Sequence, residues 1–281
     1  MISIFYKILV GTTLVGITTG IVGCFTLLNK QSLLGDAIAH ATLPGLTGMF
    51  LLILQKSYYL LLVGAGITGI CGAVAVDYIV HKTSLKKDAA LGIVLSTFFG
   101  IGILFLTMIQ KLPVGNQAGL DKFLFGQAAT LLDEDIIIIT FLACIVITTI
   151  FACWKELKIV TFDPDYAQTV GLPVKRIKKL LILLIVLTVL TGLQIVGLIL
   201  ISSFLIAPAA AARQWTNSLF YMVILTVFFS LIATTAGTII SYQYPHIPTG
   251  PAIVIIASII TFFSIIISPF KLGSKKIPAC L

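Results

Sequence analysis

An aspartate and a histidine lie four residues apart in an otherwise apolar stretch, LLGDAIAHATLPG (residues 33–45). On a helix, Asp36 and His40 would be one turn apart, so their side chains would project from the same face and could meet a single ion. A carboxylate oxygen with an imidazole nitrogen suits Mn²⁺, Fe²⁺ or Zn²⁺, whereas Ca²⁺ and Mg²⁺ prefer oxygen ligands alone. The pair therefore predicts a site for a divalent transition metal. In the alternative, Asp36 caps the helix and His40 bonds to a neighbouring helix.

Four further residues are candidates for a pathway through the protein. Pro44 and Gly45 follow His40 by one turn and should bend or break the helix, which would free backbone carbonyls as in the discontinuous helices of transporters. Gln194 interrupts a long apolar run, and His246 lies in the loop YQYPHIPTG. For the last two residues, bundle hydrogen bonding and solvation are the alternative interpretations.

The elements that must position these residues are membrane spans. The chain is 59% hydrophobic and 10% charged, with a mean hydropathy of +1.15, which excludes a soluble globular domain. Apolar stretches long enough to cross about 30 Å of hydrocarbon recur throughout. They predict one all-α transmembrane domain over residues 1–281, in contact with membrane lipid. The expected spans are 5–28, 34–54, 58–80, 89–110, 136–154, 179–196, 197–212, 219–241 and 251–269.

The count of nine depends on one apolar run, residues 179–212. It is too long for a single span, so we divide it near Gly192 and Gly197; without that division there are eight spans. With nine spans and the N-terminus outside, 14 of the 18 basic residues fall on the inside, which predicts a cytoplasmic C-terminus. The outer loop 112–135 ends in an acidic cluster that should be solvated. Nucleic-acid binding is excluded, because the basic residues are spread over separate loops.

A second motif, FDPDYAQTVGLP (residues 162–173), lies in the most basic inside loop. Asp163 is a good N-cap, Pro164 suits the first helical position, Gly171 suits the left-handed position after a helix, and Pro173 prevents continuation. The pattern predicts a helix of about two turns, exposed to a cytosolic partner. A solvated linker helix is the alternative.

The sequence has no motif for covalent or nucleotide chemistry. It contains no G-x-x-x-x-G-K-[ST] loop for ATP phosphates, no Ser/His/Asp set and no H-E-x-x-H helix. We therefore expect a permease without enzymatic activity of its own. If transport is driven by ATP, hydrolysis must be carried out by another polypeptide.

LLGDAIAHATLPG resembles the signature of the ABC-3 family of permeases. The resemblance extends over nearly the whole chain, and its motifs occur in the family's order. The other four are QAGLDKFLFGQAA (117–129), FDPDYAQTVGLP (162–173), VGLILISSFLIAPAAAA (196–212) and IPTGPAIVI (247–255).

This resemblance implies a type II importer bundle in the bacterial plasma membrane. Such a subunit would import manganese, iron or zinc, with manganese favoured, would hold the metal in transit at Asp36 and His40, and would bind no prosthetic group. It would pair with a second permease copy or paralogue, cytosolic ATP-binding subunits and an extracytoplasmic metal-binding protein. The resemblance also makes segment 162–173 a coupling helix, with Asp163, Pro164, Asp165, Ala167 and Gly171 as its residues. The alternative is a secondary metal/proton transporter without an ATPase.

Overall fold

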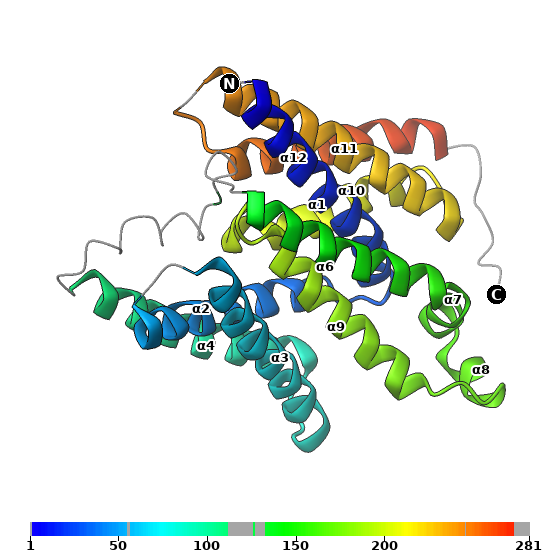
Figure 1. Ribbon diagram of the computed structural model, residues 1–281. Coiled ribbons are helices and arrows are strands. Elements are labelled where there is room, and N and C mark those ends of the chain that lie inside the picture. Colours follow the sequence, from blue (N-terminus) through cyan, green and yellow to red (C-terminus); the bar gives the residue numbers. More distant parts are fainter. Residues whose placement is uncertain (1, 55–56, 112–125, 127–132, 245, 273–281) are drawn as a thin grey trace.

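The computed structural model describes residues 2–54, 57–111, 126, 133–244 and 246–272, and these residues form an all-helical bundle (Figure 1). The helices are α1 (Ile2–Leu28), α2 (Ser32–Ile53), α3 (Tyr58–Lys82), α4 (Lys87–Gln110), α6 (Asp133–Ala152), α7 (Trp154–Phe162), α8 (Pro164–Thr169), α9 (Val174–Gly192), α10 (Leu198–Arg213), α11 (Leu219–Gln243) and α12 (Thr249–Leu272). The all-α prediction is thus confirmed.

Among the described residues, seven helices are long and apolar enough to cross a membrane: α1, α2, α3, α4, α6, α11 and α12. The two remaining expected spans correspond to α9, which has 19 residues and begins with several basic ones, and to the shorter α10, which has 16. The break between them lies where the glycines predict it. Helix α9 ends at Gly192, and Gly197, with φ at +93°, precedes α10. An L side chain rarely adopts such a φ, so glycine is the residue suited to this turn.

Three expectations need correction. Helix α2 begins at Ser32, two residues before the predicted start of the second span. The predicted span 136–154 is divided, because α6 ends at Ala152 and the separate helix α7 follows it. Helix α2 is also not broken at Pro44 but continues to Ile53. Helices tolerate an internal proline when neighbouring helices hold them, and α2 packs against α3 and α4.

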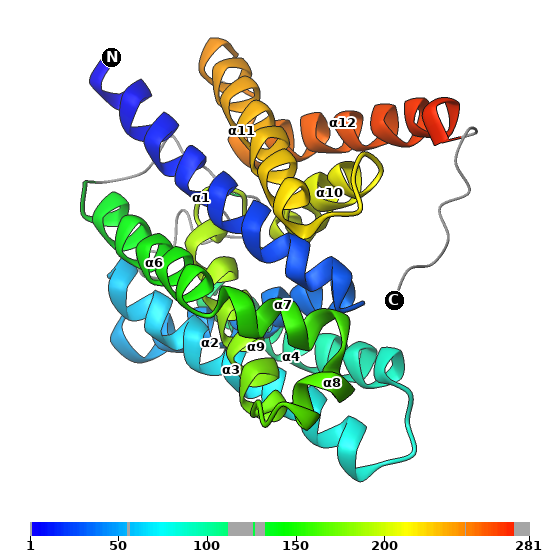
Figure 2. The same cartoon turned by 90° about the vertical axis from the view of Figure 1, so that its right-hand side faces the viewer.

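The helices form two groups with α1 between them (Figures 1 and 2). One group contains α10, α11 and α12; the other contains α2, α3, α4, α6 and α9. Helix α10 also contacts α2, so it connects the two groups. Residues contributed by α2 and α10 therefore meet where the groups join.

Glycines allow helix α2 to pack closely on both sides. A Cβ on Gly45 would overlap the carbonyl oxygen of Gly64 in α3, and one on Gly64 would lie 2.9 Å from Met49 Cβ. On the other side, a Cβ on Gly35 would lie 2.9 Å from Leu205 Cδ2 in α10. In lipid, where hydrophobic association between helices is lost, such small residues allow tight van der Waals packing. Helix α2 is accordingly the most enclosed of the spans after α1.

Candidate functional site

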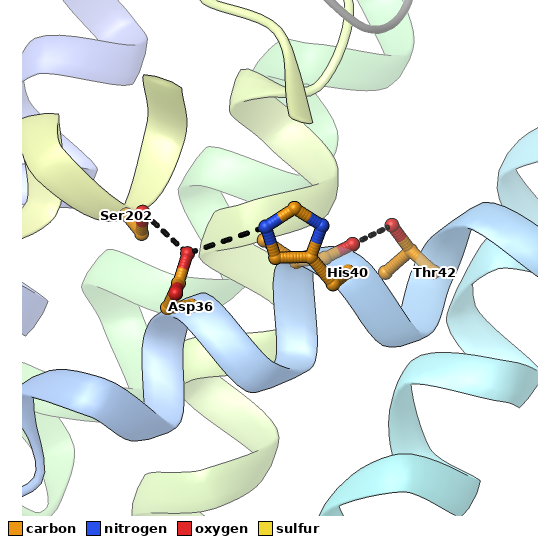
Figure 3. A network of polar contacts seen from close by, with 5 residues as sticks. Asp36, His40, Thr42 and Ser202 are labelled. Carbon is orange, nitrogen blue, oxygen red and sulfur yellow. Dashed lines mark hydrogen bonds and ion pairs between the residues drawn. The ribbon is translucent and has the colours of Figure 1, made fainter. Parts of the chain in front are cut away.

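Asp36 and His40 point toward one another from successive turns of α2, and Ser202 of α10 completes the cluster (Figure 3). His40 Nε2 lies 3.6 Å from Asp36 Oδ1, and Ser202 Oγ donates a hydrogen bond of 3.0 Å to the same oxygen. The Asp36 side chain is 33% exposed and that of His40 is 14% exposed, while Ser202 is buried. The common face predicted for the pair is present, and the hydroxyl is an addition from a distant part of the chain.

The cap interpretation of Asp36 is wrong. Gln31 occupies the N-cap position of α2, which places Asp36 in the second turn of the helix. His40 Nδ1 is buried and has no hydrogen-bond partner among the described residues. The imidazole meets Phe99 of α4 edge-on, with ring centroids 4.9 Å apart. Asp36 therefore does not cap the helix, and His40 Nδ1 makes no hydrogen bond to a neighbouring helix in the described part of the chain.

Pro44 affects the site through the backbone. Because proline has no N–H, the carbonyl of His40 lacks its usual donor four residues later in the helix. The helix is unbroken, yet a backbone acceptor remains at the residue that carries the imidazole. Pro44 itself is buried inside α2.

The donor set fits a divalent transition metal that is bound weakly. One carboxylate and one imidazole, even with a hydroxyl bonded to the carboxylate, are too few for a structural metal centre, which usually has four protein ligands. No group of three His, Cys, Asp or Glu side chains that could hold a metal occurs in the described part of the chain. An ion bound here would need water or a second protein for its remaining ligands. A site of this kind can bind an ion and release it.

Gln194 lies apart from this cluster, in the turn between α9 and α10. Its Nε2 donates a hydrogen bond of 3.0 Å to Asp135 Oδ2 in the first turn of α6. Asp135 is 3% exposed, so the solvated face predicted for the acidic cluster is wrong at this residue; Asp133 and Glu134 are exposed. Asp133 Oδ1 pairs at 2.5 Å with Lys7 Nζ of α1. The first turns of α1 and α6 and the end of α9 therefore lie at one end of the bundle.

The other predicted pathway residues have different surroundings. Gly45 is buried at the crossing with α3, so it has a packing role. His246 is exposed in the connection before α12. Of the outer loop 112–135, residues 112–125 and 127–132 lie outside the described residues. Gly126 has a φ of +72°, and a Cβ there would lie 2.6 Å from the nitrogen of Gly197. Its backbone thus packs directly on the α9–α10 turn.

The short helix predicted within residues 162–173 is confirmed as α8. Asp163 Oδ1 accepts a hydrogen bond of 2.9 Å from the Tyr166 N–H, and Pro164 occupies the first turn. Gly171, with φ at +82°, donates from its N–H to the Gln168 carbonyl. The Leu172 N–H bonds to the Ala167 carbonyl. These two bonds form the Schellman arrangement that ends a helix at glycine.

The side chains of α8 and its flanking residues form a buried set and an exposed set, and the exposed apolar side chains were not among the residues predicted from the motif. Ala167 is fully buried and fixes the helix to the rest of the chain. Tyr166 and Val170 are both 56% exposed, and Phe162 just before the helix is 52% exposed. Exposed aromatic and aliphatic side chains on a rigid, capped helix form a surface suited to a protein partner. The sequence motif indicated the helix, but its contact face requires the three-dimensional structure.

Gly171→Ala is expected to loosen the end of α8 without any steric clash. A Cβ at Gly171 meets no atom within 4 Å, so the cost comes from the positive φ alone and is about 1 kcal/mol. Hydrogen exchange at residues 171 and 172, whose N–H groups make the terminal bonds, should accelerate about fivefold. Gly92→Ala is the control, because its Cβ also has open space but a helical backbone. Equal exchange in both variants would contradict the argument.

Comparison with known proteins finds similar proteins both by sequence and by structure. The sequence model of the ABC 3 transport family matches residues 1–268. The zinc transport system membrane protein TroC of Treponema pallidum is 42% identical over 263 residues, which cover 94% of this chain and 88% of that protein. The manganese transport system membrane protein MntC of Bacillus subtilis is 43% identical over 271 residues, which cover 96% of this chain and 62% of that protein. The solved structure of PsaBC from Streptococcus pneumoniae in complex with Fab matches with a TM-score of 0.84 and 34% identity, covering 96% of this chain and 95% of that one.

Proposed function

The chain belongs to the ABC 3 transport family and has the fold of a type II importer membrane subunit, and we propose that it is the permease through which an ATP-driven importer carries manganese or zinc into the cytoplasm. The observation that carries the proposal is the Asp36–His40 pair on a largely buried helix. An ionisable pair inside a membrane span is costly to bury and marks a substrate path. As a permease, the chain carries out no chemistry on covalent bonds.

Manganese is the cargo we favour, with zinc or iron as the runner-up. One relative is named for zinc transport and another for manganese transport. The donor pair of one carboxylate and one imidazole contains no thiolate, which suits manganese better than the softer metals. The ligand preferences of these metals overlap, and the affinity of such a site for them follows the Irving–Williams order. The permease site alone would therefore not select manganese, and the selection would occur at a binding protein that delivers the ion.

The orientation proposed from the basic loops places the N-terminus outside. The Lys7–Asp133 ion pair agrees with the four crossings expected between the starts of α1 and α6, which place both starts on the same side; the side itself is inferred from the basic loops alone. Asp36 follows the inner connection between α1 and α2, and Ser202 follows the outer turn after α9. Since these two side chains are hydrogen-bonded, the metal site would lie between the two membrane surfaces. That depth suits a site reached alternately from each side.

We further propose that α8 is the coupling helix. Tyr166 and Val170 would contact a cytosolic ATP-binding subunit, while Asp163, Pro164 and Gly171 fix the ends of the helix and Ala167 its attachment. Asp165, in the first turn, would be the charged contact. A second permease copy or paralogue would complete the pathway, and an extracytoplasmic metal-binding protein would deliver the ion.

The test is uptake by the assembled complex in proteoliposomes. The chain would be purified together with its ATP-binding subunits and reconstituted, and manganese and zinc uptake measured with ATP, without ATP and with vanadate. We expect uptake only with hydrolysable ATP. Uptake driven by a proton gradient without any ATPase would instead establish the secondary transporter and refute the proposal.

Ser202→Ala should weaken the metal site while leaving the bundle folded. The hydroxyl orients Asp36 through a 3.0 Å hydrogen bond, and loss of such a partner of a metal ligand typically costs about tenfold in affinity or activity. The half-saturating metal concentration for uptake should rise by about that factor, and Ser202→Thr should restore it. Ser203→Ala is the matched control, because Ser203 is the exposed neighbour on the same helix. An equal effect of both alanine variants would rule out the positioning role.

A further inference from the structure

One exposed face of α3 has the pattern of a surface in contact with lipid. Tyr59 is 61% exposed and Tyr78 is 64% exposed, and between them the same face carries Val63, Ile67, Ile70 and Val74. The two tyrosines are 19 positions apart along the helix, which corresponds to about 28 Å. This matches the hydrocarbon core of about 30 Å, whose two boundaries are where tyrosine concentrates. The face thus fits a bilayer, with one tyrosine at each interface.

A groove runs along this face between α3, α6 and α9. Its larger part has a volume of about 540 Å³ and is lined by apolar side chains that include Val63, Phe141 and Leu187. A second part, of about 250 Å³, continues it between α3 and α9. Ile70 and Leu183 line both parts, so the two parts adjoin one another along the helices. Its length and apolar lining suit an acyl chain.

The far end of the groove is basic. Lys179 lines it, together with Asp77, whose Oδ1 lies 3.3 Å from His81 Nδ1. More positive charge surrounds this end, and all of it is exposed: Lys82 at the end of α3, and Lys175 and Arg176 in the first turn of α9. Basic side chains beside a groove between membrane helices are the usual recognition element for anionic headgroups.

We propose that this groove is a binding site for an anionic phospholipid. One acyl chain lies between α3, α6 and α9, and the phosphate meets Lys179 at the basic end. In the orientation proposed above, that end faces the cytoplasmic leaflet, which carries the anionic lipid to which basic segments bind. The groove shares no residue with the Asp36–His40 cluster, so lipid binding there is independent of the metal that the protein carries.

The test uses the complete complex, stripped of lipid and titrated with phosphatidylglycerol or with phosphatidylcholine of the same acyl chains. Retained lipid is counted by native mass spectrometry. Lys179→Gln removes the headgroup contact, and Ile70→Trp fills the groove where its two parts join. Lys178→Gln is the matched control, because it removes the same charge from the adjacent position, which does not line the groove.

We expect the parent protein to retain phosphatidylglycerol in preference to phosphatidylcholine. Lys179→Gln should reduce that preference about fivefold, the effect of one basic side chain at a lipid headgroup. Lys178→Gln should preserve it, and Ile70→Trp should release both lipids. Equal retention of the two lipids by the parent protein would overturn the proposal, as would equal effects of the two lysine variants. A change of oligomeric state in Ile70→Trp, with lipid retention intact, would assign the groove to a second copy of the chain instead.

Discussion

Replacing Asp36 with asparagine is expected to abolish ATP-driven metal uptake while the complex still assembles. The amide keeps the shape of the side chain and can still accept the hydrogen bond from Ser202, but it loses the charge that attracts a divalent cation. Loss of an outer partner already costs 10–100-fold at metal sites, so loss of the ligand charge should cost on the order of 100-fold or more. The measurement is initial uptake rate against metal concentration in proteoliposomes.

His40→Ala should have a comparable effect, and the chain contains a matched control for it. His81 also follows an aspartate by four residues, Asp77, at 3.3 Å, but it is exposed at the end of α3 among lysines. His81→Ala should therefore leave uptake unchanged. If His40→Ala and His81→Ala transport equally well, the ligand assignment fails, whereas the transport function itself would still stand.

Gly45→Ala is expected to destabilise the folded protein by about 2–3 kcal/mol. The new Cβ would overlap the carbonyl oxygen of Gly64, and a backbone atom cannot move aside as the end of a flexible side chain can. Helices α2 and α3 would be forced apart along their crossing. The yield of monodisperse protein in detergent and its unfolding temperature should both fall.

Gly48→Ala provides the comparison on the same helix. A Cβ there would lie 3.6 Å from Phe105 Cε2, an ordinary contact distance, and should be tolerated. If the Gly45→Ala protein is as stable as the parent but defective in transport, Gly45 belongs to the pathway, and its packing role is contradicted.

Features that depend on neighbouring residues in the chain could be predicted from the sequence. The shared face of Asp36 and His40 follows from helical periodicity, and α8 follows from Asp163, Pro164 and Gly171, whose preferences are local. The division of the long apolar run near Gly192 and Gly197 was also predictable, because glycine readily adopts the positive φ found there.

Features that depend on packing could not be predicted in this way. Ser202 is 166 residues from Asp36, and its hydrogen bond exists only because α10 packs on α2 beside Gly35. Asp135 belongs to an acidic run, which indicates solvent exposure. In the structure its side chain is buried, and it accepts a hydrogen bond from Gln194 in the α9–α10 turn. Pro44 indicated a break, but the surrounding helices keep α2 continuous. In each case the tertiary contact outweighs the local preference.

The Gly45–Gly64 contact leaves little space for sliding between α2 and α3, so we expect these helices to move together as one rigid body when the permease changes state. Helices would then shift relative to one another where their contacts are made by flexible side chains. The contact between α2 and α10 is of this kind, because Gly35 meets the end of the Leu205 side chain. The Ser202–Asp36 hydrogen bond crosses that boundary. A movement of α2 and α3 relative to α10 would therefore make or break the hydrogen bond that orients the Asp36 carboxylate. The affinity of the site for the ion would then alternate with the side to which the pathway is open.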